Sequence, residues 1–161
     1  TAHLGMSSSQ GEPPKKTSNA PVVALVAWTI LVMFWMVITR MAEFKRLGVT
    51  LDNIPPGSRG VDLEGRADPR AQWKSHNYTH LVEQPTLFYA IALTLALMDM
   101  GSGANYWLAW GYVALRVVHS LIQGTVNIVK WRLAVFVLAT LCLIGLALHA
   151  ALRIANDCGL I

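Results

Sequence analysis

The chain has 161 residues, of which 54% are hydrophobic and 14% are charged, with a formal net charge of +4 and a mean hydropathy of +0.44. Soluble domains usually carry about 25% charged residues, so this composition excludes an ordinary soluble protein. Two cysteines imply no disulfide framework, and the excess positive charge lies in loops beside apolar segments, where it indicates membrane orientation rather than nucleic-acid binding.

The N-terminal part contains the first apolar segment. Residues 1–20 are polar and rich in Ser, Pro, Gly and Lys, which predicts a disordered tail. Residues 21–39 are uncharged, and at about 1.5 Å per residue they are long enough to cross a bilayer as a helix. We expect this first span to cover residues 21–44. A polar connector rich in proline and glycine follows, and this composition predicts a loop.

The second predicted span covers residues 69–100 and carries polar groups toward an apolar stretch. Asp68-Pro69 has the pattern of a helix N-cap followed by proline at the first helical position. The helix then passes Asn77, His80 and Glu83 before Pro85, where we expect a kink. Such prolines are tolerated in membrane helices when neighbouring groups satisfy the backbone atoms that they release.

The third predicted span, residues 103–129, contains the most informative pattern in the chain. Its polar residues are three or four positions apart and therefore share one helix face: Tyr112, Arg116, His119, Gln123 and Asn127. An arginine at membrane depth costs at least about 2.5–3.5 kcal/mol on insertion scales. Arg116 must therefore face a partner, a water-filled cavity or an anionic ligand.

A basic turn containing Lys130 and Arg132 precedes the fourth predicted span, residues 133–153, and residues 155–161 form a tail. Residues 21–154 therefore predict one all-α membrane domain, a four-transmembrane-helix up-down bundle. The first connector and the basic turn together hold nine positive residues, against three at the opposite side. The positive-inside rule places both connections in the cytoplasm and both termini outside.

The second and third spans both carry polar residues through the cytoplasmic half of the bilayer. This predicts a cytoplasm-facing polar pocket between them, or between the same helices of neighbouring subunits. Glu83 and Arg116 could instead form a structural ion pair that joins the two helices. Asn77 and His119 could serve only in helix packing, and Lys130 and Arg132 only in orientation.

Two other histidine patterns have simpler interpretations. His76, His80 and Glu83 lie on one helical face and could hold a metal, but only His119 offers a further ligand, so we expect no metal site. His149, near the outer end of the fourth span, has no polar companion there, and we interpret it as a packing residue.

At these polar positions the chain resembles a known family. The pattern Arg116-Val-Val-His119 lies in the third of four spans, and Arg132 follows sixteen residues after Arg116. This pattern resembles the MAPEG family, the membrane-associated proteins in eicosanoid and glutathione metabolism. The pattern is most similar to the microsomal prostaglandin E synthase branch. The stretch NYTHLVEQPTLFYA resembles bacterial members of the family.

The resemblance implies a homotrimer in the bacterial inner membrane, with glutathione as co-substrate at each subunit interface. The first two helices of one subunit and the polar third helix of its neighbour would line the site. The implied activity is that of a glutathione S-transferase or peroxidase acting on lipophilic electrophiles that arrive from the lipid. Arginine suits the two carboxylates of glutathione. The implied glutathione-binding residues are Asn77, His80, Glu83, Arg116, His119, Gln123 and Lys130.

Arg132, or Lys130 beside it, is the candidate catalytic residue, because a cation close to the glutathione sulfur lowers the pKa of the thiol. Two departures from the family pattern favour an alternative. Aligned on Asn77, the second-helix motif Arg-x-x-x-Asn-x-x-Glu has His80 in place of Glu, and Trp73 in place of Arg. Gln123 stands where the characterised eicosanoid enzymes have tyrosine. The alternative is a non-catalytic scaffold or accessory subunit that binds other membrane proteins.

Overall fold

The computed structural model describes residues 19–63 and 65–160, with the side chains at positions 51, 61 and 63 left out. The predicted disordered tail lies outside these ranges except for its last two positions. Within them the regular structure is helical and contains no strand, which confirms the predicted all-α class. Two short 3-10 turns interrupt the first connector, and the helices are α1 (Ala20–Leu47), α2 (Pro69–Glu83), α3 (Pro85–Leu97), α4 (Ala104–Thr125) and α5 (Val129–Asp157).

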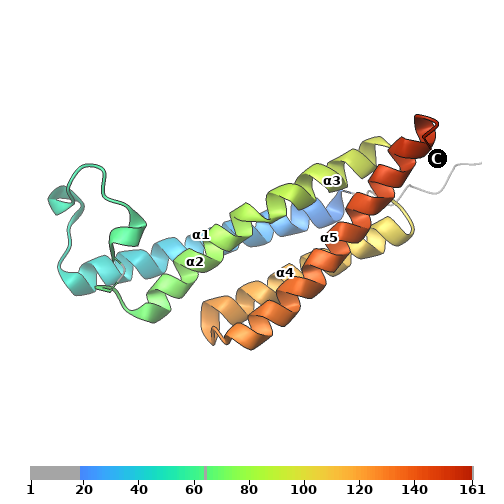
Figure 1. Ribbon diagram of the computed structural model, residues 1–161. Coiled ribbons are helices and arrows are strands. Elements are labelled where there is room, and N and C mark those ends of the chain that lie inside the picture. The colour runs from blue at the N-terminus through green and yellow to red at the C-terminus, as the bar shows by residue number, and fades with distance from the viewer. Residues whose placement is uncertain (1–18, 64, 161) are drawn as a thin grey trace, which may run out of the picture.

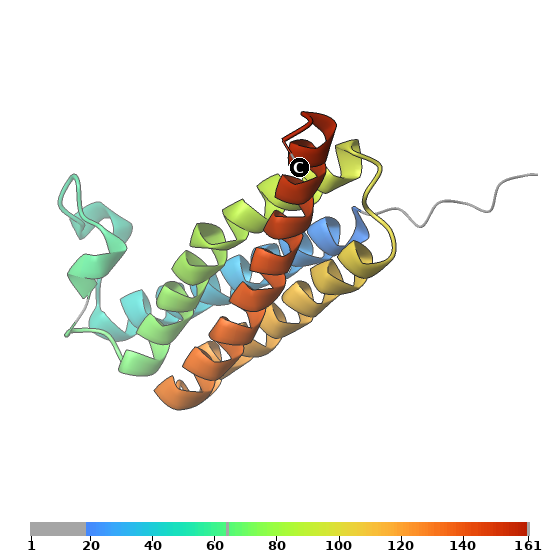
Figure 2. The same ribbon diagram turned by 45° about the vertical axis from the view of Figure 1, so that its right-hand side comes forward.

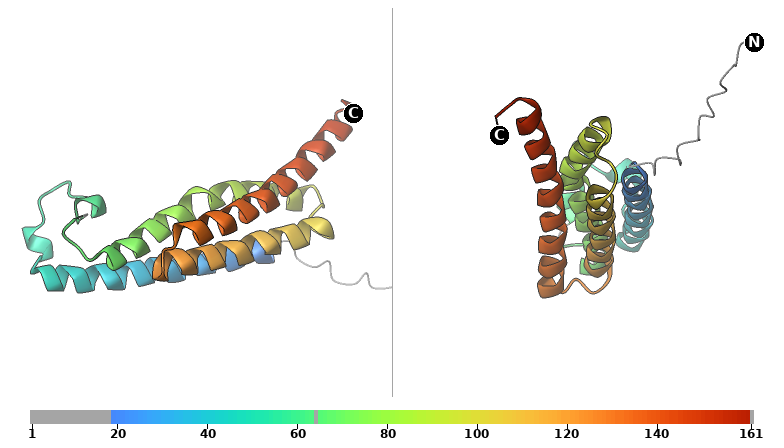
Figure 3. Two further views of the ribbon diagram at one scale, coloured as in Figure 1. Left: turned by 60° about the horizontal axis from the view of Figure 1, so that its bottom comes forward. Right: turned by 90° about the vertical axis from the view of Figure 1, so that its right-hand side faces the viewer.

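The helices form four antiparallel rods (Figure 1). Helices α2 and α3 make one bent rod, because Gln84 between them keeps helical backbone angles of φ −65° and ψ −38°. The connector 48–68 and the short turn between α4 and α5 lie at the same end of the bundle, as Figure 2 also shows. Helices α1 and α5 lie on opposite sides of the other two rods (Figure 3).

Local chemistry accounts for the helix boundaries around the connector. Helix α1 ends at Gly48, whose φ of 64° lies in the left-handed region that glycine adopts without strain. The Asp68 side chain accepts a hydrogen bond of 2.7 Å from the Arg70 amide, so the predicted N-cap of α2 is confirmed. At Pro85, where a kink is predicted, the helix is interrupted: α2 ends at Glu83 and α3 begins at the proline.

The turn between the last two helices differs from the prediction. Helix α4 ends at Thr125 rather than at 129, and Asn127 takes a left-handed φ of 52°. Helix α5 begins at Val129, so Lys130 and Arg132 lie in its first turn and not in a separate basic turn. Asparagine tolerates positive φ better than most residues, which allows the chain to reverse here without a glycine.

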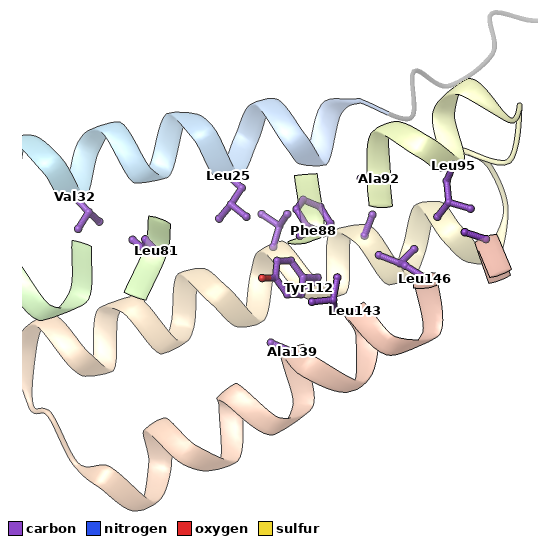
Figure 4. Close-up of a cluster of buried hydrophobic side chains, with 13 residues drawn as sticks. Leu25, Val32, Leu81, Phe88, Ala92, Leu95, Tyr112, Ala139, Leu143 and Leu146 are labelled. Carbon is purple, nitrogen blue, oxygen red and sulfur yellow. The ribbon is translucent and has the colours of Figure 1, made fainter. Parts of the chain in front are cut away.

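The apolar core runs along the centre of the bundle, where all five helices contribute side chains (Figure 4). At its middle the ring of Tyr112 stacks on that of Phe88, with centroids 4.4 Å apart. Many large apolar side chains of α1 and α5 are exposed, and these two helices are long and apolar enough to cross a membrane. Such outward apolar surfaces suit contact with lipid or with other membrane helices.

The prediction that His149 has no polar companion is wrong. His149 does have a polar companion, because its Nδ1 lies 2.5 Å from Oδ1 of Asn105 in α4. The Asn105 amide also donates to the Met100 carbonyl oxygen at 2.9 Å. The companion comes from another helix, so it was not visible in the sequence around His149.

Candidate functional site

The predicted polar face of α4 is buried against the neighbouring helices. Tyr112, Arg116, His119 and Gln123 are between 0% and 2% exposed. Asn127 does not continue this face, since it lies beyond the helix end. The spacing argument therefore holds for four of the five residues, and this face turns inward toward α2 and α5 rather than toward the surroundings.

Arg116 is satisfied by groups at the bend between α2 and α3. Its Nη1 donates to Oε1 of Gln84 at 3.2 Å, and its Nη2 donates to the carbonyl oxygen of His80. Glu83 is exposed, so the interpretation of Arg116 and Glu83 as a structural ion pair is wrong. The guanidinium charge is thus buried among neutral acceptors, with Nε lacking a partner in the described part of the chain.

Asn77 joins α2 to α4 about one helical turn nearer the connector than His80. It is fully buried, and its Nδ2 donates to the Ser120 hydroxyl at 2.8 Å. The side-chain oxygens of Asn77 and Gln123 have no partner among the described residues. Both residues therefore lie between α2 and α4, where the sequence predicts a polar pocket, and each has an acceptor oxygen without a partner.

Two histidines predicted from different helices come together at a cavity. The rings of His80 and His119 are 5.6 Å apart between centroids, and each lies close to the ring of Phe136, at 6.2 Å and 6.0 Å. The cavity beside them measures about 260 Å³ and is lined by His80, His119, Val129, Arg132, Leu133 and Phe136. It combines one fixed cation and two imidazoles with an apolar wall.

Arg132 is held at the edge of this cavity by the turn before α5. Its Nη1 donates to Oδ1 of Asn127 at 2.5 Å, while its Nε is buried and has no partner within the described residues. An arginine anchored at one nitrogen and left with other donors is suited to an anionic group in the cavity.

Other predicted site residues lie elsewhere. Glu83 and Lys130 are exposed and do not line the cavity. The metal alternative gains no support, because no three histidine, cysteine, aspartate or glutamate side chains in residues 19–63 and 65–160 are placed to hold an ion.

A second polar cavity, of about 380 Å³, lies between α1, α2 and the connector. Its cation is Arg40, which donates to the Ser75 hydroxyl at 2.7 Å and supports Gly60 of the connector. A Cβ at Gly60 would lie 2.5–2.9 Å from guanidinium atoms, so a larger residue there would displace the Arg40 side chain. Arg40 is one of the nine positive residues that the sequence assigns to membrane orientation, and its spacing gives no sign that it lines a cavity together with His76.

The two long apolar outer helices and the buried polar side chains between the helices are the arrangement of a membrane-embedded helix bundle with a polar site inside it. The model of the MAPEG family matches residues 18–152, which is most of the chain, so the protein belongs to the MAPEG family. This confirms the family predicted from Arg116, His119 and Arg132. Comparison with curated proteins and with solved structures finds no significant match.

Proposed function

We propose that the protein is a glutathione-dependent transferase or peroxidase that acts on lipophilic electrophiles in the membrane. The observation that carries this proposal is the cavity in which Arg132, His80 and His119 meet an apolar wall. Family membership supports it, because the MAPEG family includes glutathione transferases and peroxidases. Glutathione needs cationic and polar contacts for its backbone, and its acceptor needs apolar surface, and this cavity offers both kinds.

Arg132 is the proposed catalytic residue, because it is the cation on the cavity wall. A guanidinium beside the sulfur favours thiolate over thiol and so lowers the pKa of the glutathione thiol. The proton leaves to solvent, and the thiolate forms a bond to the electrophilic carbon while the leaving group departs with its electron pair. With a lipid hydroperoxide, the sulfur attacks oxygen, the O–O bond breaks, and the alkoxide takes a proton. The sulfur is left as a sulfenic acid, and the thiol of a second glutathione attacks it to form the disulfide while the oxygen leaves as water.

The remaining polar residues are proposed to position the tripeptide. His80 and His119 contact it in the cavity. Asn77 and Gln123 are buried and do not line the cavity, so we propose that they support its wall from the interface of α2 and α4. Arg116 contributes positive charge from behind the cavity wall. Glu83 and Lys130 are exposed in one chain, and we propose that they reach glutathione only where a neighbouring subunit of a homotrimer closes the site.

This arrangement is proposed to face the cytoplasm of the bacterial inner membrane. The first residues of α5 line the cavity, so it lies toward the end of the bundle that carries the connector and the α4–α5 turn, where most positive residues gather. A cytoplasmic opening supplies glutathione, while the exposed apolar helices allow the acceptor to enter from lipid.

The test uses the full chain purified in detergent or nanodiscs. Wild type is expected to increase the thiolate absorbance of added glutathione and to conjugate a generic aromatic electrophile. At neutral pH, Arg132→Leu should weaken both signals and retain its helical circular dichroism. Absence of both signals from well-folded wild-type protein would refute the enzyme.

One observation favours a second function. Gln123 stands where the characterised eicosanoid enzymes have tyrosine, and the described residues that line the His80–His119 cavity include no tyrosine in compensation. Tyr112 is stacked on Phe88 inside the core and is not available to the cavity. A non-catalytic accessory subunit would keep the fold, give neither glutathione signal, and co-purify with other membrane proteins.

A further inference from the structure

A chain of hydrogen bonds joins three helices behind the cavity. Arg116 of α4 donates to Gln84 Oε1, Gln84 Nε2 donates to Thr140 Oγ1 of α5 at 2.9 Å, and Thr140 donates to the Phe136 carbonyl oxygen at 2.8 Å. A guanidinium can only donate, so the Gln84 amide must present its oxygen to Arg116 and its nitrogen to Thr140. Each hydrogen bond in this series is therefore donated in the same direction, from Arg116 toward the Phe136 carbonyl oxygen.

Both ends of this chain carry walls of the cavity. Arg116 also holds the carbonyl oxygen of His80, and the His80 ring lines the cavity. The Phe136 ring lines it from α5, and His119 follows Arg116 by one turn of α4. A substitution of Gln84 should therefore change the positions of three side chains that line the cavity: His80, His119 and Phe136.

Gln84 lies at the end of α2, directly before Pro85, where the helix loses a backbone donor. Pro85 has no amide hydrogen and so leaves the Leu81 carbonyl without its usual helical donor. Arg116 donates at the preceding residue, His80, which places a cation at the carboxyl end of α2, where the helix dipole favours it. The bend of α2 and the position of Arg116 therefore depend on each other.

The chemistry of Gln84 matters as much as its place. A neutral amide satisfies a guanidinium nitrogen without cancelling its charge, whereas a carboxylate at the same distance would cancel it. We propose that Gln84, supported by Thr140, is a positioning residue: it orients the buried Arg116, keeps its charge uncompensated, and thereby strengthens the binding of anionic glutathione in the His80–His119 cavity. This inference rests on the proposed function for its ligand.

The first test separates charge from packing. Gln84→Glu supplies a carboxylate at Arg116, so KM for glutathione should rise at least about fivefold while kcat changes less and the melting temperature does not fall. Gln84→Met keeps length without the acceptor and should raise KM and lower the melting temperature together. A purely structural Gln84 would leave KM unchanged in the glutamate variant, and that result would overturn the proposal.

The second test examines Thr140. Thr140→Val removes the hydroxyl and should raise KM about twofold to fivefold, the loss expected for one neutral hydrogen bond, and Thr140→Ser should restore it. Thr94→Val is the matched control, because Thr94 makes the same bond to the carbonyl oxygen four residues earlier, at 2.9 Å, on exposed α3 surface. Equal effects of Thr140→Val and Thr94→Val would contradict the proposal.

A third measurement does not need glutathione. In ¹⁵N-histidine NMR spectra, Gln84→Met and Thr140→Val should shift the His80 and His119 ring signals and leave those of His76 and His149 in place. If wild type neither binds nor conjugates glutathione, the proposed function fails, and these signals still decide the positioning role. Unshifted His80 and His119 signals in both variants would refute that role.

Discussion

Trp35 of α1 and Gly124 of α4 are in direct contact. A Cβ built on Gly124 would lie 2.8 Å and 2.9 Å from two ring carbons of Trp35 and 3.4 Å from Nδ2 of Asn77. No ordinary side chain fits at such distances, so glycine here allows α1, α2 and α4 to approach one another at the end of the bundle that carries the candidate site.

The first prediction concerns this contact. Gly124→Ala should destabilise the protein by about 1–2 kcal/mol, because overpacking of about 1–3 kcal/mol outweighs a gain in helix propensity of up to about 1 kcal/mol. Thermal unfolding in detergent measures this. Gly111→Ala is the matched control, since its Cβ would meet the Cys142 sulfur at an ordinary 3.5 Å, and it should be neutral or stabilising. Equal changes in melting temperature for Gly124→Ala and Gly111→Ala would contradict the prediction that Gly124 is needed for this contact.

The second prediction concerns the buried bond between Asn77 and Ser120. Ser120→Ala leaves the Asn77 amide without its 2.8 Å partner, and should cost about 0.6 kcal/mol, the average for bonds between membrane helices, and at most about 1.7 kcal/mol. Ser102→Ala, at an exposed turn position, serves as the control. A Ser120→Ala protein as stable as wild type would mean that this bond does not hold α2 to α4.

The third prediction concerns the anchor of Arg132. Asn127→Gly keeps the positive φ of 52° available but removes the acceptor of Arg132, so stability should stay nearly constant while glutathione conjugation falls about tenfold. Asn127→Ala loses the same acceptor and adds backbone strain of about 1 kcal/mol. Conjugation and melting temperature measured on both variants separate the two effects. Full activity of Asn127→Gly would show that the anchor is dispensable.

The fourth prediction concerns pH. A cation beside the sulfur lowers the pKa of glutathione, so its removal in Arg132→Leu should raise that pKa and move the alkaline rise of the conjugation rate upward by about one pH unit or more. At neutral pH the rate must then fall, and at high pH it should partly recover. Arg153→Leu removes a cation paired with Asp157 at the other end of α5 and should leave the profile unchanged. A pH profile of the Arg132→Leu variant that matches wild type would exclude Arg132 as the thiolate partner.

The sequence was sufficient for the helical class, the bend at Pro85 and the buried face of α4. These depend on local rules: proline ends a helix, and residues three or four apart share a side. His80 and His119 were predicted from two helices, and the structure brings their rings together.

The partner of Arg116 could not be predicted in the same way. Glu83 and Gln84 are adjacent in sequence but about 100° apart around a helix, and only packing decides which one faces α4. Charge suggested Glu83, whereas the geometry selects Gln84. Thr140 gave no signal at all, because a single threonine in an apolar helix usually bonds only to its own backbone.

The measurement closest to the central claim is a crystal structure of the protein grown from lipid with glutathione present. We predict the tripeptide in the cavity of His80 and His119, with its sulfur beside the Arg132 guanidinium and Gln84 still bonded to Arg116. Glutathione bound away from Arg132, or a cavity that stays without it at saturating concentration, would contradict the account.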